Sequence, residues 1–178
     1  MRILLLPVEK NMSSCEIFLG KFATTTSGSE LLWRKIIGIL WLFAPLAIFA
    51  FSPLMSKEAG ECVTWRPPKE TYSVVWTVII LCLMASWVFI SRNAALGPWI
   101  GQVVLYFIVI FLSILWILMY RQNKRNGIAV FVALLMVLSV TVPLSFKVNI
   151  YAGVLLLPLV VWAIFNLGIN CAEIQCSK

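Results

Sequence analysis

The chain contains no histidine and no aspartate, and only 12% of its 178 residues are charged. Histidine is the commonest metal ligand and a frequent general base. Its absence excludes a Ser-His-Asp relay, a His-ligated zinc site and a haem held by a proximal histidine. Soluble domains carry about 25% charged residues. With 62% hydrophobic residues, the chain is therefore not a soluble globular domain.

The five cysteines do not form a metal-binding pattern. None belongs to a Cys-x-x-Cys pair, and no histidine is present to complete a zinc site. We expect them to act as small apolar or interfacial residues, and we predict no metal site and no obligatory cofactor. The alternative is that Cys62 forms a disulfide, if its loop faces an oxidising compartment. The sequence does not identify the partner cysteine.

Long apolar runs separate the few charged residues. Five of them approach the ~20 residues that an α-helix needs to cross a hydrocarbon core about 30 Å thick. Short links join four of the five, so we predict an all-α membrane protein, a compact bundle of five transmembrane helices. This domain covers residues 36–172, between a polar N-terminal tail at 1–35 and a short C-terminal tail at 173–178. The predicted spans are residues 36–55, 72–91, 99–120, 127–146 and 150–172.

The net charge of +7 is spread over the predicted loops and not gathered on one polar face. This distribution argues against a nucleic-acid partner and for the lipid bilayer. More lysines and arginines lie close to the spans on the side that carries the C-terminus, which favours a cytosolic position for that side. When the basic residues of the N-terminal tail are counted as well, the two sides no longer differ in their number of basic residues. The apolar run at residues 3–6 is too short for a signal peptide, while a cleaved or organelle-targeting tail stays open.

The longest connection between the spans contains a stiff segment, Trp65-Arg66-Pro67-Pro68. Two consecutive prolines fix φ, remove two N–H donors and keep the preceding residues extended. Long loops in compact domains are usually lids or binding elements, or are disordered. We therefore predict that residues 65–68 form a lid. The alternative is that Trp65 is an interfacial residue and the prolines only start the next helix.

Aromatic and hydrogen-bonding side chains share one face of three predicted helices when placed at 3.6 residues per turn. Polar side chains in lipid are costly unless they face the bundle, so we predict that these faces line an internal pocket; the alternative is that they only pack helices together. No carboxylate or imidazole lies within a predicted span, so neither acid–base catalysis nor ion-coupled transport is expected. The residues are Tyr72, Trp76, Leu83 and Trp87 in the second span, Tyr106, Ser113, Trp116 and Tyr120 in the third, and Pro158, Trp162, Phe165, Asn166 and Asn170 in the fifth.

Several motifs follow one another along the chain. They are Trp65-x-Pro67-Pro68, Val75-Trp76, Trp116, and Pro158-x-x-x-Trp162-x-x-Phe165-x-x-x-x-Asn170. Their order and spacing resemble the TspO/MBR family, the translocator or tryptophan-rich sensory proteins, over about residues 36–172. The resemblance implies a five-helix membrane protein, often a homodimer, whose pocket between the helices binds porphyrins and, in animal members, cholesterol. It also implies that the loop after the first helix closes over this pocket.

The resemblance implies a pocket role for Trp76 and Trp162, which match family tryptophans implicated in light-dependent porphyrin degradation. We expect no enzyme in the ordinary acid–base sense, but the sequence does not decide whether this chain degrades porphyrins in light. The chain also departs from the family. Ser113 stands where many relatives have Asn, and Cys171 follows Asn170 in place of the Tyr of the animal sterol-recognition segment. Sterol recognition through this segment is therefore not expected.

A tetrapyrrole is a flat apolar disc with polar edges, and it needs aromatic faces, neutral hydrogen-bonding groups and a cation, here Arg66 or Lys69. We predict an integral multi-pass membrane receptor for protoporphyrin IX or other hydrophobic ligands, linked to stress sensing or ligand transport. Without histidine, free protoporphyrin is expected to bind at least as well as haem. The alternatives are a transporter of lipophilic small molecules and a structural membrane-assembly subunit. The sequence does not decide whether the protein lies in the mitochondrial outer membrane, another organelle membrane or the bacterial envelope. The predicted site comprises Tyr72, Trp76, Ser113, Trp116, Trp162, Phe165, Asn166 and Asn170, with Trp65, Arg66, Pro67 and Pro68 in the lid.

Overall fold

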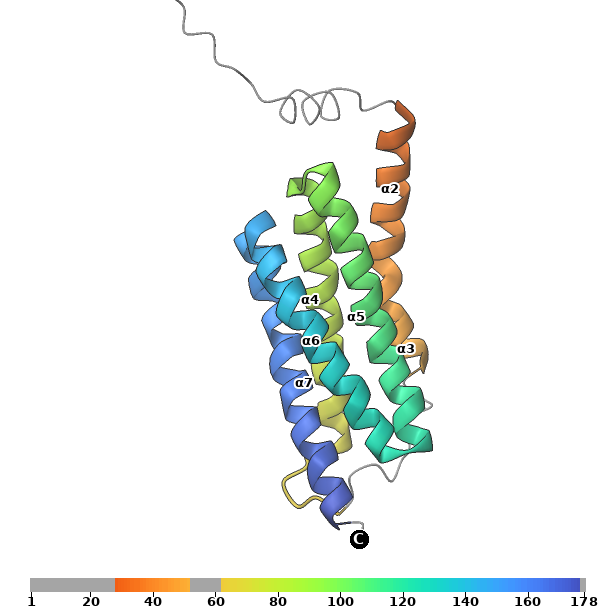
Figure 1. Cartoon of the computed structure of the whole chain (residues 1–178), viewed down its shortest axis with the longest axis vertical. Coiled ribbons are helices and arrows are strands. Elements are labelled where there is room, and N and C mark those ends of the chain that lie inside the picture. The colour runs from red at the N-terminus through yellow and green to blue at the C-terminus, as the bar shows by residue number, and fades with distance from the viewer. Residues whose placement is uncertain (1–27, 52–61, 177–178) are drawn as a thin grey trace, which may run out of the picture. The chain divides into compact units, whose positions relative to one another are not determined.

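The computed structural model describes residues 28–51 and 62–176 (Figure 1). Every regular element within these ranges is helical, and five stretches are long and apolar enough to cross a membrane. The predicted all-α fold with five spans is thus confirmed. The elements are α2 (Gly28–Phe43), the 3-10 helix η1 (Ala44–Leu46), α3 (Ala47–Phe51), α4 (Lys69–Asn93), α5 (Leu96–Gln122), α6 (Lys124–Val148) and α7 (Ile150–Cys176).

The first span, Leu32–Phe51, is not one continuous α-helix. Pro45 lies at the start of η1, which separates α2 from α3. Proline lacks the N–H that an α-helix needs at this place, so the chain tightens into a 3-10 turn before the helix resumes. The chain divides into two compact units after Ile37, so only the end of α2 belongs to the same unit as the later helices.

Of the described helix ends, only the start of α7 at Ile150 coincides with a predicted one, and α4, α5 and α6 extend two or three residues beyond their predicted spans at both ends. The largest differences are at α2, the first described helix, which begins at Gly28 inside the predicted tail, and at α7, which continues to Cys176, past residue 172. Hydropathy locates the apolar part of a helix, whereas the helix itself continues as long as its backbone is hydrogen-bonded and its charged side chains find partners. The rest of the predicted tail, residues 1–27, and the end of the first predicted span lie outside the described residues.

Single asparagines form the turns between the last three helices. Asn123 separates α5 from α6, and its side-chain oxygen accepts a hydrogen bond from Arg125 N at 2.9 Å. Asn149 separates α6 from α7 and accepts from Tyr151 N in the same way, at 2.8 Å. Asparagine is a favoured N-cap because its side chain satisfies an unpaired backbone N–H. Each residue thus ends one helix and starts the next, which makes the neighbouring helices antiparallel.

Within the second unit, α4, α5, α6 and α7 run side by side (Figure 1). α6 packs against both α5 and α7, and α7 also packs against α4. The indole N–H groups of Trp41 and Trp87 donate to the carbonyls of Val103 and Gly38, at 2.9 and 2.8 Å. These bonds join the end of α2 to α5 and α4, because both indoles point inward from their helices.

A buried polar layer crosses the bundle interior through Ser86, Tyr106 and Ala152. Ser86 Oγ donates to the carbonyl of Ala152 at 2.8 Å. Since this uses the only proton of Ser86, the hydroxyl of Tyr106 donates to Ser86 Oγ. All three residues are buried. The layer therefore joins α4, α5 and α7 by hydrogen bonds whose polar groups are satisfied within the bundle.

Gly153, in the first turn of α7, is a position where the chain has no room for a side chain. A Cβ at this residue would collide with the ring of Phe146 in α6. We expect Gly153→Ala to lower the free energy of unfolding by about 1–3 kcal/mol, the usual cost of overpacking. The measurement is the unfolding midpoint of the purified protein in mixed micelles.

The matched control for this substitution is Gly101→Ala in α5. A Cβ at Gly101 meets no atom within 4 Å, and the position is exposed. This change is expected to be neutral or slightly stabilising, because alanine is the better helix former. Equal unfolding midpoints for the two variants would contradict the close approach at Gly153.

Candidate functional site

A small cavity lies at the end of the bundle where α4 begins and where α5 and α7 end. Its volume is about 10 Å³. Five of its seven lining residues belong to the predicted site or lid, and the lining comes from three stretches that are distant in the sequence. The lining residues are Arg66, Tyr72, Trp116, Tyr120, Asn166, Ile169 and Asn170.

Four aromatic side chains next to this cavity form a cluster that we call the aromatic wall. Trp162 and Phe165 stack on one face of α7 with ring centroids 5.3 Å apart. Tyr72 of α4 meets the Trp162 ring edge-on at 5.2 Å, and Trp65 of the lid meets Phe165 edge-on at 5.7 Å. Such edge-to-face pairs are favourable because the positive edge of one ring faces the negative face of the other. The wall therefore joins the lid, α4 and α7.

Arg66 brings a positive charge to the cavity. Its guanidinium lies over the ring of Tyr72, 5.4 Å from the ring centroid, and lines the cavity from the lid. The backbone N–H of Arg66 donates to the carbonyl of Val63 at 3.1 Å, and the Val63 side chain is buried. The turn and the cation–π contact together fix the lid over the cavity.

Three buried N–H donors at this end of the bundle have no acceptor within the described residues. They are the indole Nε1 groups of Trp116 and Trp162 and the amide Nδ2 of Asn170. Trp116 and Asn170 line the cavity, and Trp162 belongs to the aromatic wall. A buried donor without a partner costs about 1–3 kcal/mol. A ligand with acceptor atoms would therefore be favoured here.

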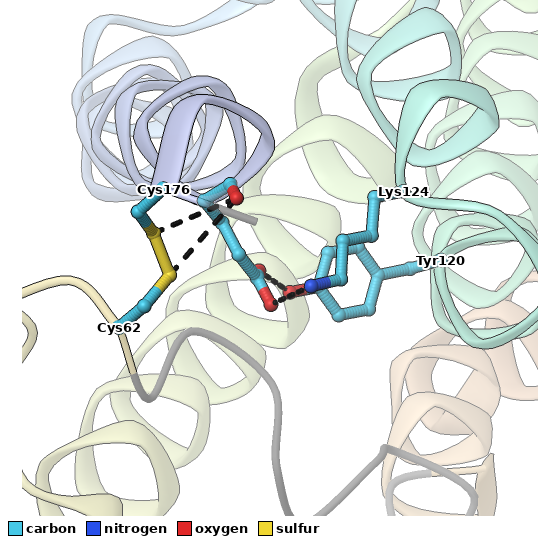
Figure 2. Close-up of a disulfide and its surroundings, with 5 residues drawn as sticks. Cys62, Tyr120, Lys124 and Cys176 are labelled. Carbon is cyan, nitrogen blue, oxygen red and sulfur yellow. Dashed lines mark hydrogen bonds and ion pairs between the residues drawn. A yellow bond between two sulfur atoms is a disulfide. The ribbon is translucent and has the colours of Figure 1, made fainter. Parts of the chain in front are cut away.

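Glu173 lies one residue beyond the predicted fifth span but within α7, which continues past it. It lies in α7 with only 1% of its surface exposed, and its carboxylate forms an ion pair with Lys124 of α6 at 2.8 Å. The hydroxyl of Tyr120 donates to the second carboxylate oxygen. In Figure 2, Tyr120 and Lys124 approach from the side opposite the disulfide. The carboxylate is buried because both of its oxygens have partners.

The remaining predicted residues do not line the cavity. Trp76 is buried on α4, one helical turn beyond Tyr72. Ser113 is buried too, but its hydroxyl donates to the carbonyl of Val109 in its own helix at 2.8 Å. Pro67 and Pro68 set the entry to α4, with Pro68 as its N-cap residue. The prolines therefore start the helix, while Arg66 of the same segment lines the cavity.

Tyr120 and Ile169 line the cavity but are not among the predicted site residues, and Glu173 bonds to Tyr120 beside it. Helical spacing did place Tyr120 on the pocket-facing side of the third span, four residues after Trp116. Glu173 also continues the polar face of α7, three residues after Asn170. For Ile169 the sequence offers no signal, since an apolar residue is ordinary at any position of such a helix.

Cys62 and Cys176 form a disulfide, with Cα atoms 6.2 Å apart and 114 positions between them in the sequence (Figure 2). For these two cysteines the alternative of a disulfide at Cys62 therefore applies, and Cys176 is the partner that the sequence did not identify. Cys82 and Cys171 are free thiols. The disulfide attaches the chain just before the lid to the last residue of α7.

The cavity is small in this structure. Its volume suffices for about one water molecule, whereas pockets for drug-sized ligands have about 300–1,000 Å³. A drug-sized ligand therefore needs more space than the cavity offers with its side chains in these positions. Chemically, the site offers aromatic faces, neutral N–H donors and one guanidinium, so it fits a flat apolar ligand with acidic edge groups.

Comparisons with known proteins agree with this architecture. The model of the TspO/MBR family matches residues 41–173, which is most of the chain. No curated protein matches the chain. The matched range includes the lid, all the predicted pocket residues and Glu173.

Proposed function

Because the chain belongs to the TspO/MBR family, we propose that the cavity beneath its lid binds tetrapyrroles of the protoporphyrin IX type. Family membership and the five apolar helices make the chain an integral, multi-pass membrane protein of the binding or sensory class. In this proposal it is a receptor that links ligand binding to stress sensing or to ligand transport. A homodimer, which the family resemblance implies, is part of the same proposal.

The observation that carries the proposal is the set of buried donors without acceptors on Trp116, Trp162 and Asn170. Protoporphyrin IX has two propionates, whose oxygens accept hydrogen bonds, and a ring that can stack on the aromatic wall. Arg66 adds a charge-assisted hydrogen bond to one propionate. The ligand would thus satisfy groups that are costly to leave unpaired, while the wall buries its apolar ring.

The test is a titration of protoporphyrin IX into the purified full-length chain, followed by tryptophan fluorescence. We expect saturable quenching. Trp162→Phe keeps an aromatic ring but removes the unpaired N–H, so its affinity should fall about twofold to tenfold, which corresponds to one neutral hydrogen bond.

The matched control is Trp99→Phe, the same change at a buried tryptophan near the other end of α5. This residue lies about 25 Å along the helix from Trp116, at 1.5 Å per residue. Its variant should bind as tightly as the parent chain. Unsaturable quenching that is equal in all three proteins would refute the binding site and favour a structural role.

A further inference from the structure

The Cys62–Cys176 disulfide joins the lid segment to α7 at a place where both sulfur-bearing residues are exposed. Cys62 lies three residues before the lid, and Cys176 is the last residue of α7. The other end of the lid continues directly into α4. The lid is therefore held covalently at both sides: by the disulfide before it and by the start of a transmembrane helix after it.

The contacts that keep the lid closed are few and noncovalent. Trp65 is 51% exposed and meets α7 through Phe165, and its ring lies near Gly168, where an added Cβ would be 3.6 Å away. Arg66 rests on Tyr72, and Val63 is buried beside the turn. Side-chain contacts of this kind open locally when the backbone that carries them is free to move.

We propose that Cys62 and Cys176 are a thiol–disulfide switch that regulates access to the cavity. The oxidised pair keeps the lid on α7, and the reduced pair frees its N-terminal side, so that ligands exchange faster. The proposal rests on the proposed function in one respect, namely that the cavity is the ligand site. The movement of the lid itself is independent of any ligand.

The chemistry is an ordinary exchange with a dithiol reductant. One thiolate of the dithiol attacks a sulfur of the disulfide and forms a mixed disulfide, while the other cysteine leaves as a thiolate. The second thiolate of the reductant then resolves the mixed disulfide. Two electrons and two protons pass to Cys62 and Cys176, and the dithiol becomes a cyclic disulfide. Because both cysteines are exposed, the first attack needs no unfolding of the bundle.

The first experiment measures the lid without ligand. The full-length chain in lipid nanodiscs is compared after oxidation and after reduction with dithiothreitol, and peptide mapping verifies the Cys62–Cys176 link. Hydrogen exchange of the Trp65 and Arg66 amides should be faster in the reduced protein. The double variant Cys62→Ser/Cys176→Ser should exchange at the reduced rate under both conditions.

The matched control is Cys82→Ser/Cys171→Ser, which removes the free thiols at residues 28–51 and 62–176 and keeps the disulfide. It should respond to the reductant as the parent chain does. Reduction of the unsubstituted chain needs no mutation, so the result does not depend on how well the serine variants fold. Failure of the link to form under oxidation, or equal exchange in both redox states, would overturn the switch.

The second experiment measures the release of protoporphyrin IX. Reduction should raise the dissociation rate about threefold to tenfold, the range expected when one or two lid side chains lose their fixed positions. The Cys62→Ser/Cys176→Ser variant should release the ligand at the faster rate throughout. Saturable binding with equal release in both redox states overturns the switch and leaves the proposed function intact. If protoporphyrin IX does not bind at all, the proposed function fails, and hydrogen exchange of the lid still decides whether the switch exists.

Discussion

Replacing Arg66 by Gln is expected to weaken the binding of protoporphyrin IX about tenfold to a hundredfold. The guanidinium lines the cavity from the lid and lies over the ring of Tyr72. A hydrogen bond between a guanidinium and a propionate is charge-assisted and contributes about 1.5–3 kcal/mol, which corresponds to this change in the dissociation constant. Glutamine keeps part of the side chain and a donor but removes the charge. The measurement is the fluorescence titration with the full-length chain.

Two controls separate the charge from other effects of this substitution. Protoporphyrin IX dimethyl ester has the same ring without carboxylates, so its affinity should change little between the parent chain and Arg66→Gln. Arg92→Gln, an exposed position in the last turn of α4 at the other end of the helix, should bind both compounds as the parent chain does. An equal loss of affinity for the acid and the ester would show that Arg66 acts through packing of the lid and not through its charge.

Replacing Lys124 by Met is expected to lower the free energy of unfolding by about 2–3 kcal/mol. The substitution removes the cation from Glu173, whose carboxylate is 1% exposed. Breaking a buried ion pair on one side costs about 3–5 kcal/mol. We expect a value below this range, because Lys124 is 41% exposed and solvent screens part of the attraction. The measurement is unfolding in mixed micelles.

A double-mutant cycle isolates the ion pair from other effects. Glu173→Gln alone should cost about 1 kcal/mol, since the amide oxygen still accepts from Tyr120. The combined variant should be more stable than Lys124→Met alone, because no buried charge remains. Arg125→Met, the same type of change at the exposed neighbour, should stay within about 0.5 kcal/mol. Purely additive effects at Lys124 and Glu173 would contradict the pair.

The membrane-spanning helices could be predicted because lipid requires a long apolar run for each crossing. The exact helix ends could not. α7 continues through Glu173 only because Lys124 and Tyr120, from other parts of the chain, satisfy its carboxylate. A hydropathy profile depends only on the residues near each position in the sequence. It therefore predicts that a helix ends at a charged residue, even where the folded bundle provides partners for that charge.

The candidate site could be predicted in part. Helical spacing placed Tyr72, Trp116, Asn166 and Asn170 on inward faces, and the structure brings them to one cavity. It did not show that Ser113 bonds within its own helix, since both orientations are compatible with the same spacing. The disulfide was equally out of reach, because the choice among the cysteines depends on distances that only the fold determines.

The polar layer of Ser86, Tyr106 and Ala152 bears on the direction in which a ligand can travel. Tyr106 precedes Trp116 by ten residues on α5, about 15 Å of helix, so the layer lies deeper in the bundle than the cavity. Its hydrogen bonds tie three helices together. An axial route through the bundle would have to break these hydrogen bonds. If the cavity binds a ligand as proposed, the ligand would therefore reach and leave it without crossing this layer.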